Sequence, residues 1–252
     1  MRRAARVLVA LLALAGAWPE RAYAEAAAPD TAAPLLTRRD TFFALATTAA
    51  VAITAAHDRR ATAEAIEWNS TNARGLSRAA RQMGEPLAIA PVLLAVDVVA
   101  RLAHTQTPAA ASERIALSIA TATLATMAVK LVTGRVRPFE SPDNAAKYRP
   151  FSGEDSFPSG HSAIAFALAS SLDHETRSRW VPCIAYPMAA LTAWSRVRDD
   201  RHWASDVVAG AALGSWVARK VDTLSMRRWP DGLVLVPVPQ ASGVEVRARL
   251  KF

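Results

Sequence analysis

Six apolar segments recur along the chain after its first forty residues, and polar breaks containing Gly, Pro or Asn separate them. They cover residues 41–56, 87–103, 112–131, 160–172, 181–195 and 205–221. Each segment is long enough for a helix, and none alternates apolar with polar residues as a half-buried strand does. The pattern predicts an all-α domain over residues 41–225, built as a six-helix bundle.

Residues 226–252 follow a different periodicity. Apolar and charged residues alternate strictly from Val244 to Phe252, and a turn-forming stretch separates them from the apolar run that begins at Leu233. A period of two residues is typical of strands. We therefore predict a short C-terminal β-hairpin that packs on the helices.

The first residues have the three parts of a secretory signal. Arg2, Arg3 and Arg6 precede an apolar run over residues 7–17, and an A-x-A site ends at Ala24. The run has 11 residues, whereas a spanning helix needs about 20. We therefore predict a signal peptide over residues 1–24, cleaved rather than kept as an anchor, and a flexible lead-in over residues 25–40. The mature chain is then expected in the cell envelope.

The apolar segments leave membrane insertion open. Residues 87–100 and 115–129 are apolar nearly all round, as buried or membrane helices are. Charged residues interrupt the same region at Asp97, Arg101 and Glu113, and most runs are shorter than a full span. Both a membrane bundle and a soluble periplasmic bundle fit this pattern.

The formal net charge of +8 limits the classes of binding partner that we expect. The basic residues are scattered, without the runs or interleaved aromatics of single-strand binders, so nucleic acid is not expected. An anionic membrane surface or an anionic substrate fits better. The one cysteine and the five histidines show no metal-ligand spacing, so no metal or other cofactor is predicted.

Three short stretches concentrate residues suited to phosphate chemistry. They are Lys130 to Arg137–Pro138, Pro158–Ser159–Gly160–His161, and Ser195–Arg196 followed by His202 and Asp206. Lysine and arginine bind phosphate oxygens, and a helix N-terminus that begins after Ser159 presents free N–H groups to anions. His202 and Asp206 are four residues apart, so on a helix they share a face and the carboxylate can hold the imidazole.

The order of the helices brings these stretches together. In an up-and-down bundle, the end of the third helix, the start of the fourth, the end of the fifth and the start of the sixth lie at the same end. The three stretches occupy those four places. We therefore predict that all these cations and histidines line one rim of the bundle.

The pattern K-x6-RP, PSGH and SR-x5-H-x3-D resembles that of the PAP2 superfamily, which holds type 2 phosphatidic acid phosphatases and vanadium haloperoxidases. The resemblance covers about residues 85–221. It implies a metal-independent phosphatase whose nucleophile is His202, oriented by Asp206, with His161 as the acid for the leaving oxygen. It implies that the phosphate is bound by Lys130, Arg137, Ser159, Gly160 and Arg196. Arg135 and Arg198 lie in the spacers and are expected to be solvated.

The predicted function is hydrolysis of a phosphomonoester or diphosphate through a phosphohistidine. The hydrophobicity of the bundle favours a lipid substrate, such as phosphatidate, an isoprenoid diphosphate or lipid A, and a periplasm-facing site. Vanadate is expected to bind in the phosphate site as an inhibitor. The alternatives are a soluble periplasmic acid phosphatase, a vanadate-dependent haloperoxidase, which the modest length disfavours, and a non-catalytic anion-binding protein, which the His202–Asp206 pair disfavours.

Overall fold

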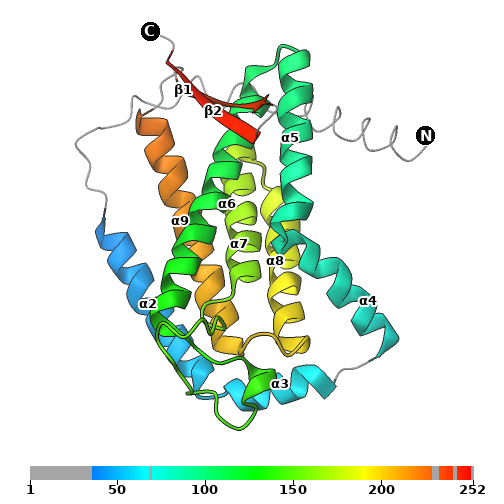
Figure 1. Cartoon of the computed structure of the whole chain (residues 1–252), viewed down its shortest axis with the longest axis vertical. Coiled ribbons are helices and arrows are strands. Elements are labelled where there is room, and N and C mark those ends of the chain that lie inside the picture. The colour runs from blue at the N-terminus through cyan, green and yellow to red at the C-terminus, as the bar shows by residue number, and fades with distance from the viewer. Residues whose placement is uncertain (1–35, 68–69, 229–232, 241–242, 251–252) are drawn as a thin grey trace.

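The computed structural model describes residues 36–67, 70–228, 233–240 and 243–250 (Figure 1). The predicted signal peptide and residues 25–35 of the lead-in lie outside these residues, whereas residues 38–40 are helical and not the flexible segment expected there. The α-helices of the described part are α2 (Arg38–Ala55), α3 (Asp58–Glu67), α4 (Thr71–Ala80), α5 (Pro86–Leu102), α6 (Gln106–Thr133), α7 (Gly160–Thr176), α8 (Val181–Arg198) and α9 (Ala204–Arg228). Two 3-10 turns accompany them, η2 (Arg81–Gly84) and η3 (Pro138–Glu140).

The domain is helical, as predicted, and each of the six apolar segments coincides with a helix. The expected number of helices is wrong, because α3 and α4 are additional to those six in the described part of the chain. Both are short and polar, and α4 is an amphipathic helix capped by the Ser70 hydroxyl, which accepts from the Ala73 N–H at 3.1 Å. A search for long apolar runs passes over such helices, since only a narrow stripe of each is buried.

Helix α7 stands at the centre of the bundle, with α6, α8 and α9 packed around it (Figure 1). Its contact with α8 includes several alanines, among them Ala165, Ala169 and Ala189, which are all fully buried. A Cβ atom built on Gly214 of α9 would lie 2.0 Å from the carbonyl oxygen of Ala163, so the two backbones touch. Small side chains therefore let α7, α8 and α9 approach one another closely.

The C-terminal strands β1 (Leu233–Gln240) and β2 (Gly243–Leu250) pair in antiparallel register, with Leu233 opposite Leu250. Their packing on the helices stays a prediction.

The outer surface of the bundle carries many large apolar side chains. Phe42 of α2, Leu87 of α5 and Leu124 of α6 are all mostly exposed, and α2 buries none of its residues. Among the described residues, α6 over Thr107–Thr133 is long and apolar enough to cross a bilayer, and only 28% of its apolar window is buried. The segments Thr71–Gly84 and Pro86–Leu102, bent by 57°, pass the same test as a pair. Exposed apolar surface of this extent indicates contact with a partner or a membrane.

Candidate active site

The first two predicted cations follow one another at the end of α6. Lys130 lies in the last turn of α6, and Gly134 ends that helix with a left-handed φ of +54°, turning the chain toward Arg137. Arg137 donates from Nε and Nη2 to the two carboxylate oxygens of Asp155, at 2.7 and 2.8 Å. The Lys130 ammonium donates to the Asp155 backbone carbonyl, and it lies 3.7 Å from Oδ2 of the same residue. The two cations thus share one carboxylate.

Asp155 belongs to none of the three stretches that the sequence singles out. Its side chain is half-exposed, and it lies in the short segment that leads into α7. Burial by itself would raise the pKa of Asp155, but the hydrogen bond from Arg137 and the charge of Lys130 outweigh this and lower it. A carboxylate therefore occupies the position where the two cations can bind an anion.

The second predicted stretch of phosphate ligands opens α7. Ser159 is the N-cap: its hydroxyl accepts from the N–H of Ser162 at 3.4 Å, and its own N–H donates to the Asp206 carbonyl at 2.9 Å. A Cβ atom built on Gly160 would lie 4.0 Å from Cε of Lys130, so the N-terminus of α7 faces the lysine. The first turn of α7 therefore points its N–H groups toward the cations, in an arrangement suited to anions.

His202 is almost completely buried in the turn between α8 and α9. Its Nδ1 lies 2.7 Å from the backbone carbonyl of Ser156. Because a carbonyl only accepts, this contact places the proton on Nδ1 and leaves the lone pair on Nε2. Burial lowers the pKa of His202, and the charges of Lys130 and Arg196 add to this effect. The ring is therefore held neutral, with one nitrogen available as a nucleophile.

Asp206 does not hold the imidazole in the direct way that the spacing predicts. Its Oδ2 is 3.7 Å from Nδ1 of His202, which is too long for a hydrogen bond. That oxygen accepts instead from the Ser156 hydroxyl at 2.5 Å and from the Trp203 N–H at 2.9 Å. Asp206 therefore positions Ser156, whose carbonyl binds the imidazole ring, and so acts on His202 indirectly.

The expectation that Arg135 is solvated is wrong, since only 2% of its surface is exposed. Its guanidinium donates to Oδ1 of Asp206 at 2.5 Å and to Oδ2 of Asp58 at 2.7 Å. It also donates to the Ser205 hydroxyl at 2.7 Å. Two buried carboxylates around one arginine form a fixed ionic network, which ties α3 to the start of α9. The expectation for Arg198 is also wrong: its side chain is largely buried and pairs with Asp199 at 3.0 Å.

Arg196 and His161 complete the rim. Arg196 is 8% exposed, and its buried Nε makes no hydrogen bond within the described part of the chain. The Nε2 atom of His161 lies 3.4 Å from Oε2 of Glu85, at the N-cap of α5. Burial, with the charges of Arg196 and His202, lowers the pKa of His161 to about 4. Without an anion at the rim, His161 is neutral at pH 7.

Pattern reading missed four further residues that the structure brings to the site: Asp58, Glu85, Asp155 and Ser156. Asp58 and Glu85 precede the motifs by many residues and stand in polar segments, so no spacing signals them. Among the described residues, no group of three His, Cys, Asp or Glu side chains converges as metal ligands. The arrangement combines several cations, a helix N-terminus and a neutral buried histidine, which suits attack on a phosphoryl group.

Comparison with known proteins supports this chemistry. The family model for the PAP2 superfamily matches residues 114–228. The chain is 46% identical over 79 residues to a lipid A 1-phosphatase of Porphyromonas gingivalis, which covers 28% of this chain and 18% of that protein. It is 35% identical over 89 residues to an undecaprenyl-diphosphatase of Sulfolobus acidocaldarius, covering 35% of this chain and 43% of that protein. The matches thus span less than half the length of these relatives.

The fold has a counterpart among solved structures. A transmembrane PAP2 type phosphatidylglycerolphosphate phosphatase of Bacillus subtilis superposes with a TM-score of 0.58 at 20% sequence identity. The superposition covers 74% of this chain and 98% of that one. At this identity the likeness concerns the fold, which both chains share across most of their helices.

Proposed function

We propose that this chain, whose residues 114–228 belong to the PAP2 superfamily, hydrolyses a phosphomonoester or diphosphate carried by a membrane lipid. The observation that carries the proposal is the neutral, buried His202 beside Lys130, Arg137 and Arg196. The relatives named for lipid A and undecaprenyl diphosphate support a lipid of that kind, and phosphatidate carries a phosphomonoester of the same chemical class.

The reaction proceeds in two displacements. Nε2 of His202 attacks phosphorus, the bond to the leaving oxygen breaks, and His161 gives that oxygen a proton. Water then attacks the phosphohistidine, His161 takes a proton from the water, and phosphate leaves with His202 restored. Lys130, Arg137 and Arg196, with the Ser159 hydroxyl and the Gly160 N–H, hold the phosphoryl oxygens.

Charge at the rim couples binding to protonation of the acid. His161 is neutral in the free protein because burial and Arg196 lower its pKa to about 4. A phosphate dianion bound among the cations offsets their charge and raises the pKa of His161. The substrate therefore brings about the protonation of its own general acid.

The exposed apolar faces of α2, α5 and α6 support insertion of the bundle in a membrane. In that arrangement the helices contact acyl chains, and the rim lies at the bilayer surface, where a phosphorylated head group is found. We place this surface on the periplasmic side, in agreement with the predicted signal peptide.

Substitution of the nucleophile tests the mechanism. We expect His202→Asn to reduce phosphate release by about ten-thousand-fold, while the far-end variant His174→Asn retains full activity. In the unsubstituted protein, a rapid quench with radiolabelled lipid phosphate is expected to trap label that is lost in acid and kept in alkali, as a phosphohistidine is. Turnover by His202→Asn at the original rate would rule out the mechanism. Equal use of p-nitrophenyl phosphate and lipid phosphates by a detergent-free soluble fraction would favour a soluble acid phosphatase.

A further inference from the structure

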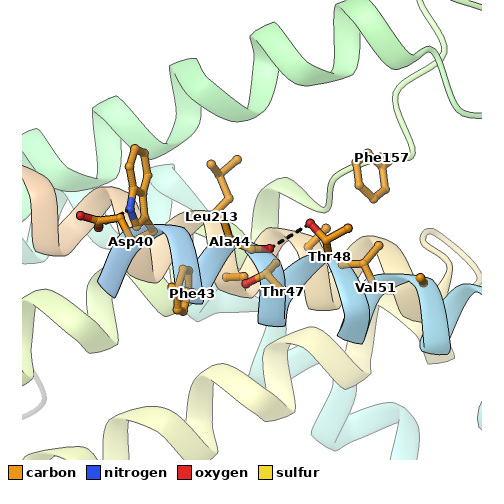
Figure 2. A pocket seen from close by; sticks show the side chains of 12 residues that line it. Asp40, Phe43, Ala44, Thr47, Thr48, Val51, Phe157 and Leu213 are labelled. Atoms are coloured by element: carbon orange, nitrogen blue, oxygen red, sulfur yellow. Dashed lines mark hydrogen bonds between the residues drawn. The ribbon is translucent and has the colours of Figure 1, made fainter. Parts of the chain in front are cut away.

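An apolar groove of about 610 Å³ runs between α2 and α9. One wall is formed by α2 from Asp40 to Ala52, and the other by the α9 residues between Ala209 and Trp216. In Figure 2 the side chains of α2 stand in a row along this groove, with Phe157 beyond one end and Asp40 at the other. The hydroxyl of Thr48 donates to the Ala44 carbonyl at 2.9 Å, so its polarity is satisfied within the helix.

The groove begins beside the active site. Phe157, which lines the groove at the end near Ala52, directly follows Ser156, whose carbonyl is 2.7 Å from Nδ1 of His202. Ala209 lies three residues after Asp206 on α9. A molecule held at the catalytic rim therefore has the open end of the groove within reach of its leaving group.

The other end of the groove is closed by polar groups. The Trp216 indole N–H donates to Oδ1 of Asp40 at 2.9 Å, and the Lys220 ammonium donates to Oδ2 of Asp40 at 2.6 Å. Between this cluster and Ala52, twelve residue steps along α2 correspond to about 18 Å. A bilayer's hydrocarbon core is about 30 Å thick, so the groove is deep enough for most of one chain within a leaflet.

We propose that the α2–α9 groove binds one hydrocarbon chain of the lipid whose phosphate is hydrolysed at the rim. The inference rests on the proposed lipid substrate. It goes beyond that proposal because it assigns the hydrocarbon chain a binding position and a limit to its length. An apolar chain in the groove covers the inner faces of α2 and α9, whose apolar lining water solvates poorly. The cluster of Asp40, Trp216 and Lys220 closes the groove, because a longer chain would have to displace its hydrogen bonds.

Two alanines on α2 allow a matched test. Ala44 lines the groove, whereas Ala46 does not, and both are exposed, so a larger side chain at either position leaves the core intact. We expect Ala44→Phe to lower kcat/KM for long-chain phosphatidate in mixed micelles by about tenfold. The same variant is expected to hydrolyse dihexanoyl phosphatidate and p-nitrophenyl phosphate at the original rate, and Ala46→Phe to hydrolyse all three as the unsubstituted protein does. Ala212→Phe, on the opposite wall, should repeat the effect of Ala44→Phe.

The possible outcomes distinguish a failure of the groove assignment from a failure of the proposed lipid phosphatase function. If the unsubstituted protein favours long-chain phosphatidate and Ala44→Phe keeps that preference, the groove assignment is wrong and the lipid phosphatase stands. An equal loss on all three substrates would likewise overturn the assignment, since it would reveal damage at the rim. If the unsubstituted protein hydrolyses p-nitrophenyl phosphate but neither phosphatidate, the lipid function itself fails, and the inference fails with it.

Discussion

Two bidentate arginine–carboxylate pairs join the α6 and α7 regions, one at each end of the bundle. At the rim with the proposed active site, Arg137 holds Asp155 at 2.7 and 2.8 Å. At the far end, Arg114 holds Glu175 at 2.6 and 2.7 Å. Their geometry is nearly the same, but the Asp155 side chain is 46% exposed, whereas that of Glu175 is fully buried. Exposure decides what each pair can do, because only a partner in contact with solvent can be exchanged for another anion.

The charged groups that surround the two pairs also differ, and this difference agrees with the difference in exposure. Lys130 and Arg196 stand beside the rim pair, so positive charge exceeds negative charge there once Asp155 moves aside. At the far end, Asp222 joins Glu175 against a single arginine, and Ser118 donates to Asp222 at 3.5 Å. The rim is thus arranged to receive an anion, and the far end to hold the helices together.

Removing each arginine in turn gives the largest expected difference. Arg137→Ala is expected to lower kcat/KM by about a hundredfold or more, since it removes donors to the phosphoryl oxygens, with little change in thermal stability. Arg114→Ala leaves Glu175 buried without its main partner, so we expect a loss of about 3 kcal/mol in stability and unchanged activity per folded molecule. Thermal unfolding in detergent and steady-state kinetics measure the two effects. Equal damage to stability by both variants would contradict the comparison.

Arg135 combines features of both ends, because it is buried like Arg114 yet contacts Asp206 of the proposed active site. We expect Arg135→Ala to lower kcat by about tenfold to a hundredfold through misplacement of Ser156 and His202, with KM nearly unchanged, because Arg135 does not reach the phosphate. Arg135→Lys keeps the charge without the fork and should recover only part of the rate. An Arg135→Ala variant with lost stability and full kcat would reduce Arg135 to a purely structural role.

Arg135 also shows where pattern reading reaches its limit. Apolar periodicity predicts each helix that is buried by a broad face, and helix order predicts which ends meet, since both depend on local sequence. Burial of a spacer residue depends on what packs over it. Arg135 is buried because Asp58, which precedes it by many residues, extends from α3 and supplies a counter-charge at 2.7 Å. Short polar helices such as α3 leave no periodic signal, and their contacts follow only from the folded chain.

A similar reason explains the difference at Asp206. The spacing of four residues correctly places its carboxylate near His202, but it does not indicate which acceptor the ring contacts. Ser156 comes from the loop before α7, and its carbonyl is closer to Nδ1 than the carboxylate is. The loop before α7 and the start of α9 both approach His202. The acceptor closer to Nδ1 makes the hydrogen bond, and this distance depends on how the two elements pack.

The pH dependence of stability gives a further test of the difference between the rim and the far end, because His161 lies at the rim. Its pKa is about 4 in the folded protein against an ordinary 6.5, so the unfolded chain binds more protons between these values. The contribution of His161 to stability is therefore fully present above pH 6.5 and is lost as the pH falls toward 4. We expect His161→Gln to remove about 2 kcal/mol of the loss between pH 7 and pH 5, with His202 accounting for part of the remainder. His104→Gln, at an exposed position between α5 and α6, is expected to follow the unsubstituted protein. Identical pH profiles for all three proteins would contradict the low pKa of His161.

The smallest expected effect concerns Asp155, the exchangeable partner itself. Asp155→Asn keeps the shape of the side chain but removes the charge that competes with an incoming anion for Lys130 and Arg137. We expect the inhibition constant of orthovanadate to fall about threefold to tenfold, which is the range of a partly exposed charged pair. Glu154→Gln is the matched control, because the neighbouring carboxylate pairs with Arg149 at 3.4 Å, away from the two cations. Weaker inhibition of Asp155→Asn would mean that Asp155 organises the arginine for the anion, and the rim pair would then resemble the fixed pair at the far end.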